Sequence, residues 1–509
     1  MATRTNRRNF LALTTAGATL AGLGDLKFLS QLPLVSAQEV KPDPKVVQLQ
    51  SEIEPVVRLL EDTPRNRLLE EVAARVKSGL TYQEVVAALL LAGVRNVQPR
   101  PSVGHKFHAV LVVNSAHLAS ISSPDEHRWL PIFWALDEFK SSQARDVQEG
   151  NWTMSPVDES SVPGPIKARQ AFIDAMENWD EGAADAAVAG LARTAGAGDV
   201  FELFARFGAR DFRSIGHKAI YVANSWRTLN CVGWRHAEPV LRSLAYALLM
   251  HEGDNPAQRD GDADRPWRRN VELAGRIRDD WQSGKLDEAV TTEMLAALRT
   301  ATPDEACDKV VELINGGAHP QAIWDALFVG SGELLARQPG IVALHAVTTT
   351  NALHYAYTAS GNDDTRRMLL LQNAAFVALF RNAMGGRGRV GDTRLDELDP
   401  QMPEGGNDGA LDEIFRLVRR EPMSAAKGVL AYLKNQGDPK QVIDAARVLV
   451  FLKGTNSHDY KYSSAVLEDY YNISSKWRDL YLASGVFNLR SSEDRDNQLV
   501  ARTRAALTG

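Results

Sequence analysis

Four stretches of similar build, spread over the whole chain, decide the fold. They are residues 72–87 (VAARVKSGLTYQEVVA), 188–205 (VAGLARTAGAGDVFELFA), 311–326 (VELINGGAHPQAIWDA) and 429–445 (VLAYLKNQGDPKQVIDA). Each reads as an apolar helix, a break that contains glycine, a start signal of Pro, Asp or Thr, and a second apolar helix. The stretches end in alanines that are 118, 121 and 119 residues apart: Ala87, Ala205, Ala326 and Ala445. The pattern predicts an internal repeat of about 120 residues.

A second motif follows these helix pairs. Residues 108–117 (HAVLVVNSAH) and 345–354 (HAVTTTNALH) share H-A-V-x-x-x-N-x-x-H, and related frames begin at His217 (HKAIYVANS) and His458 (HDYKYSSA). The two full copies lie at matching distances from the preceding alanines, 21 residues in one case and 19 in the other. Matching distances of this kind make chance a poor explanation for the shared letters.

The repeats predict an all-α fold, with four helical units of about 120 residues stacked as one body over residues 38–509. Alternation of the strand type is scarce. Hydrophobic residues make up 44% of the 509 positions and charged residues 24%, which are ordinary globular values. The net charge of −6 argues against nucleic acid as the main partner, because phosphate binding requires clustered basic residues.

The first 37 residues are predicted to be an export signal. Residues 5–11 (TNRRNFL) carry paired arginines, a short apolar run follows from Leu11 to Leu23, and Val35-Ser36-Ala37 offers a small-residue cleavage site. These features are typical of a twin-arginine signal peptide cleaved before Gln38. A basic membrane-surface helix is the alternative, because the apolar run is shorter than the ~20 residues that span a bilayer. We therefore expect a periplasmic or extracellular protein without a transmembrane segment.

Only two cysteines occur, Cys231 and Cys307, without a C-x-x-C spacing. Neither a disulfide framework nor a cysteine metal site is indicated. Two free buried thiols are favoured over a single bridge between them.

Histidines concentrate in the repeated frames. Seven of the eleven lie in or beside them: His105, His108, His117, His217, His345, His354 and His458. Metal ligation is one interpretation, and hydrogen-bonded architectural histidines between stacked helices are the other. Each helical residue turns by about 100°, and no frame presents two histidines and a carboxylate on one face. We therefore predict no metal ligands.

Residues that share a helix face define the candidate site. A histidine can exchange protons near neutral pH, a lysine can stabilise an oxyanion, and a hydroxyl can orient a ring. We expect His345 and His458 to line one cavity with Lys461, and Thr348 to orient the ring of His345. The predicted catalytic residues are His345, Thr348, His458 and Lys461. The predicted substrate-binding residues are His105, His108, His217, Tyr221, Asn224 and Tyr462.

These motifs resemble a known family. His345-Ala-Val-Thr348, followed by an Ala-Leu pair, is similar to the H-x-V-T element of questin oxidase-like proteins. The segment that begins at His458, with Lys461 and Ala465, resembles their C-terminal H-x-x-K-x-x-x-A element, and residues 104–108 (GHKFH) resemble the start of their N-terminal helical region.

The resemblance implies an all-α oxidoreductase of the monooxygenase type, with NADPH as cofactor and an aromatic or polyketide-like small molecule as substrate. The alternative is an exported helical repeat protein without enzymatic activity that binds a small molecule or a protein partner. A closed cavity reached by His345 and His458 would favour the enzyme, and an open solenoid with solvated histidines would favour the binding protein.

Overall fold

The structure is a computed structural model that describes residues 43–100, 105–403 and 409–508. Within these ranges it has 22 α-helices, short 3-10 turns and no strand, apart from a single β-bridge between Lys285 and Ala318. The all-α prediction is confirmed. No helix of the described ranges is long and apolar enough to cross a bilayer. The predicted signal, residues 1–37, lies outside them.

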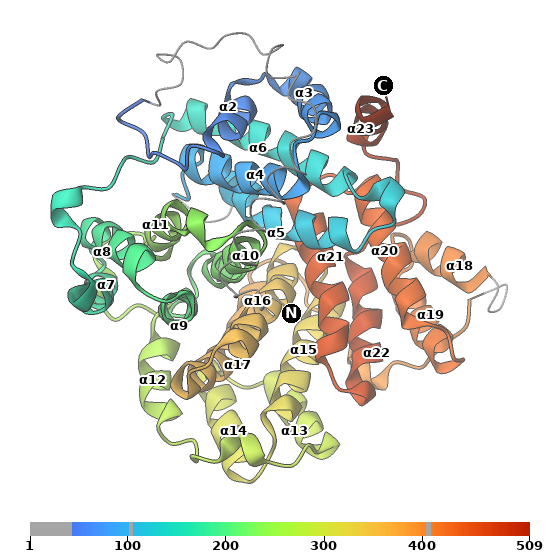
Figure 1. Ribbon diagram of the computed structural model, residues 1–509. Coiled ribbons are helices and arrows are strands. Elements are labelled where there is room, and N and C mark those ends of the chain that lie inside the picture. Colours follow the sequence, from blue (N-terminus) through green and yellow to red (C-terminus); the bar gives the residue numbers. More distant parts are fainter. Residues whose placement is uncertain (1–42, 101–104, 404–408, 509) are drawn as a thin grey trace, which may run out of the picture.

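The helices lie in four consecutive groups around a common centre (Figure 1). The first group, in blue and cyan, is α2 (Glu54–Asp62), α3 (Arg65–Lys77), α4 (Tyr82–Asn96), α5 (His108–Ile121) and α6 (Leu130–Glu149). The second, in green, is α7 (Pro165–Asn178), α8 (Glu181–Thr194), α9 (Ala197–Gly208), α10 (His217–Val232) and α11 (Ala237–Leu248).

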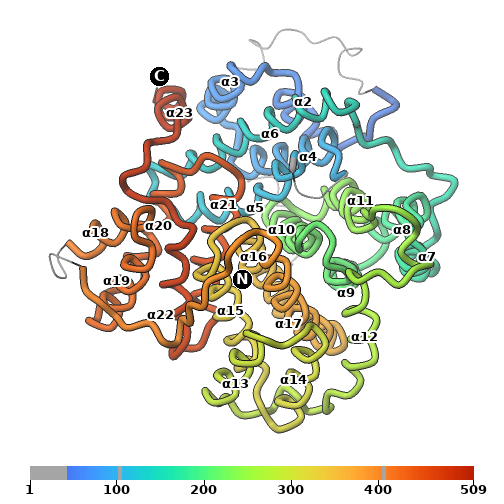
Figure 2. Tube along the Cα trace, turned by 180° about the vertical axis from the view of Figure 1, so that it is seen from behind, coloured from blue at the N-terminus to red at the C-terminus, as the bar shows by residue number. Residues whose placement is uncertain are grey.

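Helix α12 (Arg265–Ala274) leads to the third group. That group is α13 (Glu288–Leu298), α14 (Pro303–Asn315), α15 (Pro320–Arg337), α16 (Ile341–Ala359) and α17 (Asp363–Gly385). The fourth, in orange and red, is α18 (Ala410–Leu417), α19 (Pro422–Lys434), α20 (Pro439–Lys453), α21 (Ser457–Asp469) and α22 (Ser475–Ser484). The last helix, α23 (Gln498–Thr508), returns to pack on α3 and α6 of the first group, as the view from behind also shows (Figure 2).

Side-chain caps mark several helix starts, among them the start predicted at Thr81. The hydroxyl of Thr81 accepts the backbone N–H of Glu84 while the carboxylate of Glu84 accepts the N–H of Thr81, and α4 begins there. Thr302 and Asn456 cap α14 and α21 in the same reciprocal way. A capping residue satisfies backbone donors that a helix start leaves free, and is worth about 1 kcal/mol.

One helix from each group forms the centre. Helix α5 packs on α10 and α21, and α16 packs on the same two, so the four helices close a ring. They are buried on nearly all sides: in α16 every residue from Val342 to His354 is buried. A helix that is surrounded in this way belongs to the interior of a large body rather than to its surface.

The two cysteines lie on different helices and form no bridge. Cys307 is buried in α14 and Cys231 is half-buried in α10, and both are free. The prediction of two free thiols is confirmed, although only one of them is fully buried.

Candidate functional site

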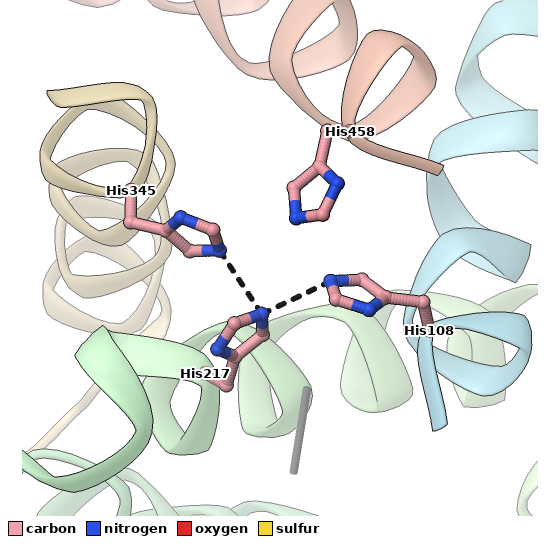
Figure 3. Close-up of side chains that lie close together, drawn as sticks. All are labelled: His108, His217, His345 and His458. Atoms are coloured by element: carbon pink, nitrogen blue, oxygen red, sulfur yellow. Dashed lines mark hydrogen bonds between the residues drawn. The ribbon is translucent and has the colours of Figure 1, made fainter. Parts of the chain in front are cut away.

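Four histidines, one from each central helix, meet at the middle of the ring. We call His108, His217, His345 and His458 the four-histidine cluster, and one ring nitrogen of each lies within 4.8 Å of the others. The Nε2 atom of His217 is 3.0 Å from Nε2 of His108 and 3.0 Å from Nε2 of His345 (Figure 3). The ring of His458 completes the cluster, with its centroid 4.5 Å from that of His108.

Backbone carbonyls fix the tautomers of two of these rings. Nδ1 of His217 lies 2.5 Å from the carbonyl oxygen of Ser214, and Nδ1 of His345 lies 2.6 Å from that of Ile341. A carbonyl can only accept, so each Nδ1 carries the proton and donates it. The Nε2 lone pairs of both rings therefore point into the cluster. Two lone pairs 3.0 Å apart repel each other unless a proton or a cation lies between them.

The backbone before His217 is strained. Ser214 and Ile215 have φ values of 54° and 46°, and Gly216 follows at 80°. A β-branched residue such as Ile215 adopts this left-handed region only at an energetic cost, and such strain concentrates at functional sites. A Cβ atom on Gly216 would lie 2.0 Å from Oγ1 of Thr349 in α16. The strained turn thus brings the carbonyl of Ser214 to the ring of His217.

Lys461 is the cationic partner of the cluster. Its Nζ lies 2.9 Å from Nε2 of His345, 3.3 Å from that of His217 and 3.5 Å from that of His108. The side chain is buried, and burial lowers the pKa of Lys461 to about 7. A buried amine titrates near neutrality because the protein interior solvates its charged form poorly. Lys461 can therefore supply or take a proton at this site.

His217 and His345 are neutral at pH 7. Burial lowers the pKa of His217 and of His345 well below 6.5, and the nearby Lys461 lowers both further. Neutral imidazole with an inward lone pair is the form that ligates metal ions.

Thr348 does not orient the ring of His345, and that prediction is wrong. Its Oγ1 is 3.5 Å from the backbone carbonyl oxygen of His345, whereas the ring is held by the carbonyl of Ile341. A threonine inside a helix bonds back to the carbonyl one turn earlier, which takes its hydroxyl away from the side chain at that position.

The other predicted residues lie in different places. The hydroxyl of Tyr221 donates to Oγ of Ser243, and that of Tyr462 donates to the carbonyl of Gly485, so both tyrosines point away from the cluster. Asn224 lies two turns past His217 in α10 and donates to the carbonyl of Leu111. Nothing is described of the His105 side chain.

A small polar space, which we call the inner cavity, lies next to Lys461. It is lined by residues of all four central helices, and its volume of about 10 Å³ is at the lower limit of what a cavity needs to hold one water molecule. Its lining residues are Asn114, Ser115, Leu118, Ile220, Asn224, Arg227, Thr348, Asn351, Lys461, Ser464 and Ala465.

Sequence reasoning missed the four-histidine cluster as a unit because it looked for ligands on one helix face at a time. The cluster takes a single ring from each of four helices. The signal that could have found it is the histidine at the start of all four repeated frames.

Comparisons of the chain with protein-family models, with curated proteins and with solved structures find no match. Function is therefore inferred from the site.

Proposed function

We propose that the protein is a metal-dependent oxidoreductase whose four-histidine cluster binds one first-row transition-metal ion. The observation that carries the proposal is the convergence of four ring nitrogens within 4.8 Å. Histidines in such sites donate their second ring N–H to a carbonyl or a carboxylate, which fixes the tautomer and the orientation. The carbonyls of Ser214 and Ile341 do this for His217 and His345.

The spacing of the nitrogens favours right-angle coordination. Two nitrogens about 2.1 Å from one ion lie about 3.0 Å apart at a right angle and about 3.4 Å apart in a tetrahedron. Nε2 of His217 is 3.0 Å from each of two neighbours. Tetragonal nitrogen sites select copper(II) or nickel(II), and copper also binds most tightly in the divalent series. Copper cycles between two oxidation states, which supports redox chemistry.

A metal-free acid–base site is the second candidate. It is favoured by Lys461, whose Nζ already faces three Nε2 atoms of the cluster. An ammonium group there satisfies inward lone pairs without any metal ion. The two candidates differ in what Lys461 does: in the first it competes with the metal for the lone pairs, and in the second it is the proton donor.

Metal analysis separates the candidates. The purified protein is stripped with a chelator, loaded with copper(II), dialysed and examined for metal content and for nitrogen hyperfine structure in its electron paramagnetic resonance spectrum. We expect one copper per chain with imidazole coupling. His108→Ala should weaken binding by more than the ~10–100-fold that loss of an outer-shell partner costs. His117→Ala is the matched control on α5, because His117 bonds Tyr82 outside the cluster.

A lysine variant provides the second arm. Lys461→Met removes the competing cation and should keep or tighten copper binding. If the wild-type chain binds no copper, and Lys461→Met abolishes turnover of a substrate found by screening, the acid–base site is correct and the metal site is not. Copper bound by the four-histidine cluster without oxidation or reduction of any substrate would instead favour the alternative of a helical repeat protein that binds a small molecule or a protein partner without enzymatic activity.

We also propose that the four helix groups are repeats of one five-helix unit. In each group the third helix packs on the fourth and the second packs on the fifth, as in α4 on α5 and α3 on α6. The alanines that end the four stretches, Ala87, Ala205, Ala326 and Ala445, all lie in the third helices. Superposition of the four groups tests the repeat, and a different helix order in the best match would refute it.

The family resemblance and the export route remain proposals of the same kind. The questin oxidase-like motifs support an aromatic or polyketide-like substrate and NADPH as reductant, which substrate screening with and without NADPH would test. The signal supports export of the folded protein by the twin-arginine route. Replacing Arg7 and Arg8 by lysine should leave precursor in the cytoplasm, and processed protein outside the cell would refute the signal.

A further inference from the structure

A larger pocket, which we call the lateral pocket, lies between the end of α7, the segment after α9 and the start of α12. Its volume is about 510 Å³, within the range of about 300–1,000 Å³ that small-molecule sites have. It shares no lining residue with the inner cavity. Buried residues form its floor: Trp179, Arg210, Pro256, Asp264 and Trp267. Exposed residues form its rim, with two basic and two acidic side chains among them: Glu177, Arg259, Asp260 and Arg268. These rim charges balance, so the floor decides which charge a ligand should carry.

Three cations surround the indole ring of Trp179. The guanidinium carbons of Arg210 and Arg213 lie 3.8 and 5.1 Å from the centre of the ring, and Nζ of Lys218 lies 5.0 Å from it. The face of an indole ring attracts cations, but it does not neutralise their charge. Cations that leave water in this way need negatively charged partners.

Two of these cations have a carboxylate of their own. Nζ of Lys218 is 2.8 Å from Oδ2 of buried Asp211. Arg213 donates to both oxygens of Asp264, at 2.5 and 2.7 Å. Arg210 donates to no carboxylate of the described residues, and Oδ2 of Asp211, 3.9 Å from its Nε, is already bound by Lys218. Two carboxylates therefore face three cations, and Arg210 is the cation without its own partner.

Arg210 is also left with unused donors. A guanidinium has five N–H groups, and Arg210 uses its two Nη atoms to donate to the carbonyl oxygens of Met176 and Leu248. Its Nε has no hydrogen-bond partner within the described part of the chain, although the residue is only 3% exposed. Burial lowers the pKa of Arg210, and the neighbouring Asp211 offsets only part of that effect. An arginine stays charged even so, and the floor of the lateral pocket therefore lacks a negative charge.

The backbone at Trp179 is strained. Its φ of 57° and ψ of 34° place it in the left-handed region at the end of α7. Glycine or asparagine usually occupies this position after a helix, because other side chains adopt it only at an energetic cost. Such strain concentrates at binding sites and active sites. The contacts of the indole ring explain why a tryptophan stands there, since that ring supports Arg210 on the floor of the lateral pocket.

We propose that the lateral pocket binds a small aromatic carboxylate whose carboxyl group pairs with Arg210. A carboxylate supplies the missing negative charge and can accept two N–H groups of one guanidinium. The indoles of Trp179 and Trp267 give the floor an aromatic surface against which the ring of the ligand can pack. Water can accept the same hydrogen bonds, but it carries no charge and leaves the cation uncompensated. The proposal goes beyond the metal site and does not depend on it.

Isothermal titration calorimetry of the purified protein with three probes tests the proposal. The probe 1-naphthoate has both the ring and the charge, 1-naphthamide has the same ring without the charge, and acetate has the charge without the ring. We expect 1-naphthoate to bind at one site per chain, at least about tenfold more tightly than either of the other probes.

Two variants locate the bound probe. Arg210→Met should remove the preference for 1-naphthoate over 1-naphthamide. Arg242→Met is the matched control, because Arg242 is also 3% exposed but pairs with Asp185 and lies outside the lateral pocket. Ala257→Trp fills the lateral pocket from an exposed position on its lining and should abolish 1-naphthoate binding. This surface variant keeps the test valid if Arg210→Met does not fold.

Several outcomes would overturn the proposal. The first is the absence of saturable 1-naphthoate binding, and the second is equal affinity for 1-naphthoate and 1-naphthamide. Binding that is lost in Arg242→Met but kept in Arg210→Met, or that survives Ala257→Trp unchanged, would place the ligand elsewhere. Acetate binding as tight as that of 1-naphthoate would show that the ring is not recognised. None of these outcomes bears on the metal site, which copper content tests separately.

Discussion

Gly216 offers the sharpest test of how the strained turn holds His217. Its φ of 80° lies in the left-handed region, and a Cβ atom there would meet Thr349 Oγ1 at 2.0 Å and Cγ2 at 2.9 Å. An alanine in this backbone conformation costs about 1–2 kcal/mol. Overpacking against a rigid neighbour adds about 1–3 kcal/mol. We therefore expect Gly216→Ala to lower the free energy of unfolding by about 2–5 kcal/mol.

The same change should weaken metal binding. Relief of the clash moves the turn, and the carbonyl of Ser214 then no longer holds Nδ1 of His217 in place. Loss of an outer-shell partner costs about 10–100-fold in metal affinity. Urea unfolding measures the stability, and competition with a coloured chelator measures the affinity for copper.

Two variants isolate the parts of this effect. Gly79→Ala has a φ of 106° but no neighbour within 4 Å, so it reports the backbone cost alone. Thr349→Ala in the Gly216→Ala background removes the two closest atoms and should recover most of the packing cost. The reasoning is refuted if Gly216→Ala costs no more than Gly79→Ala, or if Thr349→Ala recovers nothing.

Three further outcomes are expected. In the metal-free protein, His217 and His345 bind protons only in the unfolded state, so the free energy of unfolding should fall as the pH drops below about 6.5, with a slope of about 2.7 kcal/mol per pH unit. Urea titrations at pH 7.5 and 5.5 measure this slope. A slope that persists in the double variant His217→Gln/His345→Gln would contradict the assignment. Burial and the neighbouring Glu468 raise the pKa of Asp469 to about 8, so the stability that its protonated form contributes is present at low pH and is lost as the pH rises from about 4 through 8. Asp469→Asn should therefore stabilise the chain more at pH 9 than at pH 5. Equal effects at the two pH values would count against a protonated Asp469. Arg95→Met removes the buried guanidinium that pairs with both Glu54 and Glu61. Arg58 still pairs with Glu54, so the loss should lie at or just below the lower end of the ~3–5 kcal/mol that breaking a buried pair costs, about 2–3 kcal/mol. A loss under about 1 kcal/mol in thermal or urea unfolding would contradict this.

Local patterns determined the helices. The start signals at Thr81 and Asp438 are capping residues in the structure, and the alanines that end the four stretches lie in helices. Such features depend on neighbours within one or two turns, because hydrogen bonds and side-chain spacing in a helix are local. The repeated frames also marked His217, His345, His458 and Lys461 as residues worth following.

Tertiary packing alone decided what these residues form together. The rings of His108 and His217 are 109 positions apart in the chain and those of His217 and His345 are 128 apart, yet their Nε2 atoms are 3.0 Å apart. Helix periodicity states which side chains share a face, but not which faces of different helices meet. The Nε2 lone pairs of His217 and His345 point inward because the carbonyls of Ser214, in the strained turn, and of Ile341, in the first turn of α16, hold the Nδ1 protons. The burial that lowers the pKa of Lys461 arises only when the four central helices close around it. A local pattern carries no information on any of these, because each is a contact between segments that become neighbours only on folding.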